Sequence, residues 1–360
     1  MQAGGEAPRV GLRLVAWEVT RRCNLNCAHC RAGAERGPYP GEMERSKCLE
    51  ILEQISRLGN PIVILTGGEP LLREDVFDLA ACGTRLGLRM VMATNGTLLT
   101  PSHVERMKQS GIKRISISID GADKYQHDHL RKVSGAYNGA MRGISLLKEA
   151  GLEFQINTTV TRQNVEQIKE ILDLAVHLGA AAHHIFLLVP TGRAKEMVNQ
   201  EIDAREYEEL LHWFNHMKDK VNLQLKATCA PHYYRILRQE ARAKGKEVCY
   251  DTHGLDAVTR GCLAGTSFCF ISNTGIVQPC GYLELNCGDL KASAFQSIWQ
   301  GSRLFNQLRD FSSYKGKCGR CQYLRFCGGC RARAYEATGD FLAEEPLCAY
   351  NPISKTIAHG

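Results

Sequence analysis

The chain has 360 residues, of which 44% are hydrophobic and 23% charged, and its formal net charge is +7. This composition is ordinary for a soluble globular protein, and the length suits one large domain with a smaller one. The absence of any run of five Lys or Arg residues argues against nucleic-acid binding, and the absence of 18 consecutive apolar residues argues against a membrane span.

Short β-rich apolar runs alternate with segments of helical periodicity in the first half of the chain. The six runs lie at residues 14–20, 61–68, 89–95, 114–120, 153–160 and 183–190. The helical segments lie at 46–58, 76–86, 101–110, 136–150 and 165–178, and a glycine follows each of them, as is common at helix C-termini. This alternation predicts parallel βαβ units, so we expect an α/β fold built on a partial (β/α)6 TIM-like barrel.

The second half of the chain is less regular. Residues 203–218 have helical periodicity, whereas residues 240–260 are polar and hard to assign. From residue 262 the predicted strands are short and interrupted by Gly and Cys, which indicates a small domain that bound metal stabilises. We therefore expect an N-terminal extension (1–13), a barrel (14–200), a helical linker or substrate region (201–260) and a small metal-binding domain (261–360).

Cysteine is the unusual residue, because nine of the 16 cysteines lie in the last 99 residues. The first residues lack the apolar core and cleavage site of a signal peptide, so we expect a cytoplasmic protein whose clustered cysteines bind metal or do redox chemistry. The tightest group is Cys23, Cys27 and Cys30. Three thiolates are one fewer than a [4Fe–4S] cluster needs, which leaves one iron open to a cofactor or substrate. A zinc knuckle with a distant fourth ligand and a group of free thiols are the alternatives.

Small and polar residues follow the predicted strands, at the end of the barrel where such folds place their chemistry. The two glycines at 67 and 68 allow the backbone to approach a ligand, and Glu69 can accept hydrogen bonds from an amine. Ser116, Ser118 and Asp120 alternate along one strand and are expected to share a face. Asn157 and Arg193 can also be explained as a strand-end cap and a surface charge. The candidate cofactor ligands are Gly67, Gly68, Glu69, Asn95, Ser118, Asp120, Asn157 and Arg193.

The C-x3-C-x2-C loop, the Gly-Gly-Glu-Pro turn and the Ser-x-Ser-x-Asp strand, in this order and spacing, resemble the radical SAM superfamily over about residues 14–200. The resemblance implies a [4Fe–4S] cluster on Cys23, Cys27 and Cys30, whose open iron chelates S-adenosylmethionine (SAM). It also implies that residues 67–69 hold the methionine amine, and that Ser118 and Asp120 lie by the ribose or carboxylate. The chain would then be a radical oxidoreductase or decarboxylase.

The C-terminal cysteines include two C-x2-C pairs, which from their spacing alone fit structural zinc as well as iron–sulfur clusters. The pattern resembles the auxiliary-cluster (SPASM) domain appended to many radical SAM enzymes, which implies one or two auxiliary [4Fe–4S] clusters. It departs from that family between Cys327 and Cys330, where two residues stand instead of three. The resemblance assigns one cluster to Cys262, Cys269, Cys280 and Cys330, and the other to Cys318, Cys321, Cys327 and Cys348.

An unusual segment lies between the two predicted domains. It holds a thiol, an imidazole, two phenols and a guanidinium within residues 229–235. One interpretation is a helix start at Pro231 with aromatic core residues. The other is a substrate site in which Cys229 or His232 contacts iron, the Tyr233 ring stacks, and Arg235 pairs with a carboxylate.

This segment, with residues 281–286 and 330–335, resembles the heme b synthases of the siroheme-dependent heme pathway. The resemblance implies oxidative decarboxylation of two propionates of iron-coproporphyrin III, with an auxiliary cluster as electron acceptor and a flavodoxin or ferredoxin as donor. The sister 12,18-didecarboxysiroheme deacetylase and peptide-modifying SPASM maturases are the alternatives. The candidate propionate ligands, which can also be ordinary surface charges, are Arg235, Arg260, Arg331 and Arg333.

Overall fold

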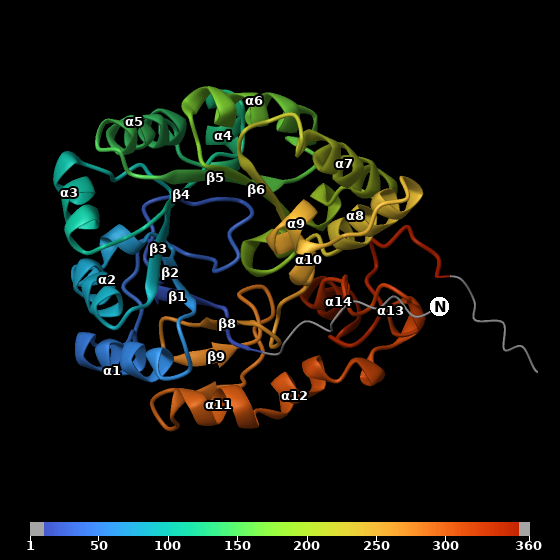
Figure 1. The fold of residues 1–360 in the computed structure, drawn as a ribbon. Helices are drawn as coiled ribbons and strands as arrows, with labels where there is room; N and C mark the ends of the chain where they lie inside the picture. The colour runs from blue at the N-terminus through green and yellow to red at the C-terminus, as the bar shows by residue number, and fades with distance from the viewer. Residues whose placement is uncertain (1–10, 353–360) are drawn as a thin grey trace, which may run out of the picture.

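The structure is a computed structural model that describes residues 11–352, so residues 1–10 of the expected N-terminal extension and the last eight residues of the expected C-terminal domain lie outside it. Its centre is a curved sheet of seven consecutive parallel strands (Figure 1). These are β1 (Leu14–Thr20), β2 (Ile62–Gly67), β3 (Arg89–Thr94), β4 (Ile115–Ser118), β5 (Phe154–Val160), β6 (Ala182–Leu187) and β7 (Gln224–Thr228). The first six coincide with the six predicted runs, which confirms the partial barrel.

The seventh strand was not predicted from the sequence. β7 has five residues, three of them polar or charged at alternate positions (Gln224, Lys226 and Thr228), and within residues 11–352 only β6 pairs with it. A short strand at the edge of a sheet needs little apolar surface, so it carries a weak sequence signal. The barrel sheet therefore extends into the segment expected to be a linker.

Helices lie on the outer, convex face of this sheet (Figure 1). They are α1 (Arg45–Ser56), α2 (Val76–Arg85), α3 (Pro101–Gln109), α4 (Lys124–Arg131), α5 (Ala136–Glu149), α6 (Ile168–Leu178) and α7 (Ala204–Met217), with 3-10 turns at η1 (Pro70–Leu72), η2 (Val165–Gln167) and η3 (Gly192–Gln200). The sequence does not predict α4, because Leu130 is its only aliphatic residue. Cys48 on α1 and Cys82 on α2 are buried in the core between helices and sheet. None of the helices in residues 11–352 is long and apolar enough to cross a lipid bilayer.

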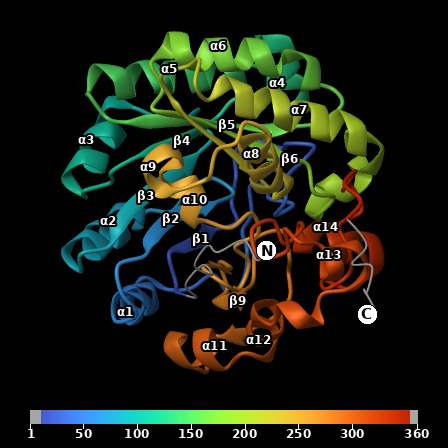
Figure 2. The same ribbon diagram turned by 45° about the vertical axis from the view of Figure 1, so that its right-hand side comes forward.

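The C-terminal region continues the same sheet rather than forming a separate layer. Its elements are α8 (His232–Ala243), α9 (Tyr250–His253), α10 (Leu255–Val258), β8 (Phe268–Ile271), β9 (Ile276–Gln278), β10 (Gly288–Asp289), α11 (Phe295–Gly301), α12 (Arg303–Arg309), η4 (Phe311–Ser313), α13 (Gly316–Arg320) and α14 (Arg331–Thr338). β8 pairs in parallel with β1, with Leu14 opposite Phe268 and Trp17 opposite Ile271. The sheet order is therefore β10-β9-β8-β1-β2-β3-β4-β5-β6-β7. Figure 2 shows β9 at the β1 end of this sheet, above α11 and α12.

Candidate active site

The loop that follows β1 brings its three cysteines into one apolar cluster. Cys23 and Cys27 are buried there with Leu25 and Ala34, and Cys30 packs against them. Two of the sulfurs accept hydrogen bonds from backbone N–H groups. Leu25 N donates to Cys23 Sγ (3.4 Å), and Ala34 N donates to Cys30 Sγ (3.4 Å). Burial raises the pKa of Cys23 to about 12, so the bare thiol is protonated at neutral pH and metal binding must displace the proton. A dry pocket with a donor for every sulfur fits an iron–sulfur cluster.

The third sulfur of this loop is reached by Arg131, at the end of α4. Its Nη1 donates to Cys27 Sγ at 3.5 Å, and its Nη2 lies 2.6 Å from an oxygen of Asp120. His29 Nε2 lies 3.2 Å from the same carboxylate. Burial opposes ionisation of Asp120, but the charges of Arg131 and His29 outweigh it and lower the pKa. The predicted site residue Asp120 therefore holds the cysteine loop through Arg131. The sequence does not single out Arg131, because α4 has one aliphatic residue and was not predicted.

The second predicted residue that holds this loop is Arg193. Its Nε donates to the carbonyl of Cys27 (3.0 Å), its Nη1 donates to the carbonyl of Ala34 (2.8 Å), and its backbone N–H donates to the carbonyl of Cys30 (3.0 Å). The neighbouring Gly192 adopts a φ of +57°, and a side chain there would collide with the carbonyl oxygen of Arg31. Arg193 is thus a clamp on the backbone of the cysteine loop rather than a surface charge.

Glu69 lies fully buried at the end of β2. Its carboxylate accepts from Thr94 Oγ1 (2.7 Å), Asn95 N (2.8 Å) and Leu71 N (3.1 Å). Burial raises its pKa to about 7, because desolvation of the charge exceeds the effect of these three bonds. A carboxylate with two oxygens has room for one more donor, such as an ammonium group.

The two glycines before Glu69 are required by the protein's own backbone. A side chain at Gly67 would lie 2.1 Å from the carbonyl oxygen of Thr20, and one at Gly68 would lie 2.4 Å from that of Arg22. The backbone N–H groups of Gly68 and Glu69 donate to these carbonyls at 2.9 and 2.8 Å. The glycine pair therefore lets the end of β2 pack directly against the backbone at the start of the cysteine loop. The sequence had predicted that these glycines make room for a ligand.

The remaining predicted cofactor ligands lie at the ends of adjacent strands. Asn95 Nδ2 donates to Asn24 Oδ1 (2.9 Å) and lies 3.9 Å from Cys23 Sγ. Ser118 and Asn157 are paired across β4 and β5, and both are partly exposed. Asn157 Oδ1 accepts from Gln155 Nε2 at 2.8 Å. The candidates thus gather on one edge of the sheet around the cysteine loop, as expected for a site at the C-terminal ends of barrel strands.

One of the two predicted C-terminal cysteine sets is brought together as predicted. Cys318, Cys321, Cys327 and Cys348 line a single cavity with His232, Arg235 and Lys317. His232 is fully buried, and neither of its ring nitrogens has a hydrogen-bond partner among residues 11–352. Arg331 Nη2 donates to Cys318 Sγ at 3.5 Å. Four thiols with basic groups around them fit a fully ligated iron–sulfur cluster.

The other predicted set is not brought together. Cys280 packs in one apolar cluster with Cys330. Burial raises the pKa of Cys280 and of Cys262, and the charge of the nearby Cys330 raises both further. Cys269 is buried in the barrel core, and the charged groups that affect its pKa are Cys287 and Arg309 instead. The Gly328–Gly329 turn, with φ of +78° and +61°, reverses the chain so that Cys327 and Cys330 face different groups across a gap of only two residues.

The predicted substrate segment lies inside the protein, between these two groups. His232, Tyr233 and Arg235 are each at most 2% exposed, and Arg235 pairs with Glu208. Its neighbour Cys229 packs in one apolar cluster with Cys330. The segment thus lies beside the cysteine groups, and its Arg235 also lines an open cavity with Glu208, His212 and Tyr350.

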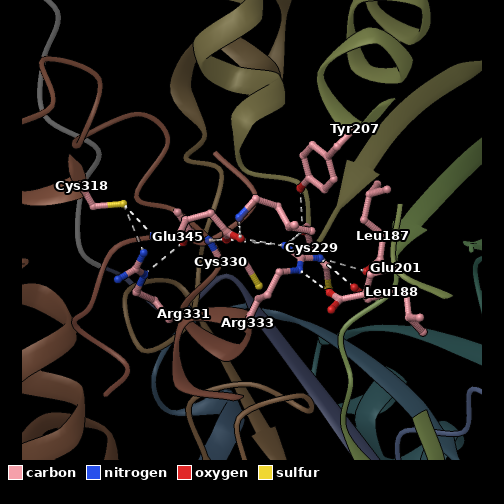
Figure 3. Close-up of polar contacts among 12 residues, drawn as sticks. Leu187, Leu188, Glu201, Tyr207, Cys229, Cys318, Cys330, Arg331, Arg333 and Glu345 are labelled. Carbon is pink, nitrogen blue, oxygen red and sulfur yellow. Dashed lines mark hydrogen bonds and ion pairs between the residues drawn. The ribbon is translucent and has the colours of Figure 1, made fainter. Parts of the chain in front are cut away.

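The proposed propionate ligands on α14 are also buried in the protein. Arg333 contacts Glu201 (3.2 Å) and Glu345 (3.3 Å), and donates to the carbonyl of Leu188 (2.9 Å) (Figure 3). Arg331 donates to the carbonyls of Phe341 and Ala343. A guanidinium with carboxylates and carbonyls on every side has no free edge for a propionate.

Arg260 completes the set of four predicted propionate ligands. It is 3% exposed, its Nη2 donates to the carbonyl of Leu324 at 3.3 Å, and its guanidinium lies 3.9 Å from the Phe311 ring centre. Arg235, Arg260, Arg331 and Arg333 are therefore buried rather than exposed as surface charges, although Arg235 also lines an open cavity. Their role as propionate ligands stays a prediction.

Comparisons with known proteins agree with this geometry. Residues 17–175 match the radical SAM superfamily, and residues 262–330 match an iron–sulfur cluster-binding domain of the SPASM type. The chain is 56% identical to an AdoMet-dependent heme synthase from Nitratidesulfovibrio vulgaris, over 96% of this chain and 94% of that one. The chain belongs to the radical SAM superfamily. As a radical SAM enzyme with a SPASM domain, it uses a [4Fe–4S] cluster, SAM and auxiliary iron–sulfur chemistry.

The chain is also similar to a second enzyme by sequence and to a solved structure by fold. Fe-coproporphyrin III synthase from Methanosarcina barkeri is 28% identical, over 93% of this chain and 87% of that one. The crystal structure of Streptococcus suis SuiB bound to S-adenosylmethionine superposes with a TM-score of 0.72, at 20% identity, over 96% of this chain and 77% of that one. At that identity the likeness to SuiB concerns the fold alone.

Proposed function

We propose that this radical SAM enzyme is a heme b synthase that converts two propionates of iron-coproporphyrin III into vinyl groups. The observation that carries the proposal is the 56% identity, over nearly the whole of both chains, to an AdoMet-dependent heme synthase. The identity to an Fe-coproporphyrin III synthase is half as large over a similar length. This difference supports a step of heme synthesis like that of the first relative.

The proposed reaction releases one electron for each propionate that is decarboxylated. When bound, the cluster and SAM supply a 5′-deoxyadenosyl radical. Transfer of a hydrogen atom from the β-carbon of a propionate gives 5′-deoxyadenosine and a substrate radical. Cleavage of the bond to the carboxylate then gives a vinyl group, CO2 and one electron. Each propionate thus needs an electron acceptor close to the porphyrin, and the auxiliary cluster domain is suited to this role.

The protein links the SAM-cluster loop directly to the auxiliary domain. Arg31, next to Cys30, pairs with Glu18 (2.8 Å), donates to the carbonyl of Gly281 (3.2 Å) and stacks on the ring of Phe270 (4.4 Å). Tyr282 lies between the two regions, because the charges of Cys229, Cys280 and Cys30 all act on its phenol. A contact of this kind gives the released electron a short path from the barrel to the auxiliary domain. A flavodoxin or ferredoxin is the proposed donor of the electron that starts each cycle.

The test is an anaerobic assay of the reconstituted, reduced enzyme with SAM and iron-coproporphyrin III, read by mass spectrometry. We expect two successive losses of CO2 plus two hydrogens, with 5′-deoxyadenosine formed. Deoxyadenosine without change of the porphyrin would refute the proposal. In that case 12,18-didecarboxysiroheme and then peptides are the substrates to assay.

A further inference from the structure

Three thiols from separate segments pack together beside the SAM-cluster loop, and a fourth lies near two of them. They come from the residue after β7, from the approach to β8, from the turn after β9 and from the start of α14, and they are Cys229, Cys262, Cys280 and Cys330. We propose that Cys229 is the fourth iron ligand of the auxiliary cluster held by Cys262, Cys280 and Cys330, and that Cys269 is not a ligand. This inference concerns the cofactor and does not depend on which substrate the enzyme uses.

Side-chain packing brings three of these thiols together. Cys229, Cys280 and Cys330 pack in one apolar cluster with Leu283 and Ala332. The charges of Cys280 and Cys330 act on Cys229, and that of Cys330 acts on Cys262. Thiols gathered in a largely apolar cluster fit a [4Fe–4S] cluster.

The backbone of Cys229 is fixed in an unusual conformation that aims its side chain at this group. Its φ is +56°, in the left-handed region that residues other than glycine rarely adopt. Two buried donors hold its carbonyl: Tyr207 Oη at 3.0 Å and Arg333 Nη1 at 3.2 Å (Figure 3). Strain of this kind persists where the surrounding contacts impose it, and it is concentrated at functional sites.

Strand geometry keeps Cys269 away from the same group. Successive side chains of a strand point to opposite faces. Phe270 faces the auxiliary site, because its ring contacts the guanidinium of Arg31 and the position of Gly281. Cys269, one residue earlier, therefore faces the other way, toward Cys287 and Arg309.

The ligand count determines what this cluster can do. Three cysteines would leave one iron open for a substrate, as in the SAM-binding loop, whereas four cysteines close the coordination sphere. With Cys229 as ligand, the cluster beside Tyr282 carries electrons and does not bind the porphyrin through iron.

The test compares Cys229→Ala with Cys269→Ala in the full-length, anaerobically reconstituted enzyme. We expect Cys229→Ala to lose about four iron atoms per chain, or to yield a [3Fe–4S]-type EPR signal, whereas Cys269→Ala keeps the wild-type iron content. The shift of the front-cluster EPR signal on addition of SAM reports that each variant is folded. Cys229→Ser keeps the volume of the side chain and is expected to shift the EPR signal of one auxiliary cluster.

Several outcomes would overturn the assignment. One is full iron content with unshifted spectra in both Cys229 variants, as a Cys229–Cys330 disulfide would give. Another is loss of iron from Cys269→Ala alone. If both alanine variants lose iron, the serine variants decide: a shifted signal in Cys229→Ser with an unshifted one in Cys269→Ser supports the proposal, and the reverse refutes it.

Discussion

The two ends of the molecule build their cysteine sites in opposite ways. The front site takes three cysteines from one loop of eight residues, 23–30, and holds them from outside by Arg131, Arg193 and Asn95. The auxiliary region draws its thiols from segments as far apart as residues 229 and 348. In the first case the local sequence sets the ligands, and in the second the fold does. Single substitutions in the two regions should therefore have different effects on iron content, stability and activity.

The largest expected effect is at the front loop. Cys27→Ala should abolish formation of 5′-deoxyadenosine, and it should remove about four of about twelve iron atoms if three four-iron clusters are present. Both are measured on the anaerobically reconstituted enzyme. Cys82→Ala, in the core of α2, is the matched control and should keep both. Loss of all iron in Cys27→Ala would mean that the two regions assemble as one unit.

The next effect tests the buried charges of the auxiliary region. Arg333→Met should lower the free energy of unfolding by about 3–5 kcal/mol, because it leaves the fully buried Glu345 without its partner. Urea unfolding under anaerobic conditions, followed by circular dichroism, measures the change. Arg205→Met, which removes an exposed pair with Glu209, should leave the unfolding midpoint where it is. Equal losses in the two variants would contradict the structural account.

A smaller effect is expected in the affinity for SAM. If Glu69 binds the methionine ammonium, Glu69→Gln should weaken SAM binding by roughly tenfold or more, the value of one charged hydrogen bond. The pKa of Glu69 is raised to about 7 by burial, and its carboxylate is the form that binds a cation. Affinity should therefore fall as the pH drops from 7.5 to 6 in the wild type, and stay constant in Glu69→Gln. Titration of the SAM-dependent EPR change measures both, and a pH-independent wild type would exclude Glu69 from this role.

The smallest effect concerns the clamp on the front loop. Arg193→Met removes side-chain bonds to the carbonyls of Cys27 and Ala34 but leaves all iron ligands in place. Residues that orient ligands typically contribute about tenfold or more to metal affinity. We expect the front cluster to be lost faster to a chelator, with the auxiliary iron unaffected. An unchanged rate of loss would show that the loop keeps its shape without this side chain.

The sequence predicted the barrel well because its signals are local. Six strands with helical segments between them appear as alternating periodicities, and the C-x3-C-x2-C loop is contiguous. The strand β7 and the helix α4 were missed because each carries few apolar residues. The placement of Cys229 beside Cys330 was missed because Cys229 follows β7. The position of Cys269 apart from its predicted partners was missed because its face of β8 becomes evident only once β8 pairs with β1. Exposure was also misjudged for the four arginines, since a charged residue is expected at the surface unless a buried partner is known.

The pairing of β8 with β1 has a consequence for the order of events during synthesis. β1 leaves the ribosome well before β8, its second neighbour, which follows roughly 250 residues later, about 12–50 s at ~5–20 residues per second. During that interval one edge of β1 has no strand partner, and the adjoining cysteine loop is not yet covered by the C-terminal region. An unpaired strand edge is prone to wrong association. The nascent chain thus passes through an interval in which this edge of β1 is open, and the arrival of residues 268–271 closes the edge.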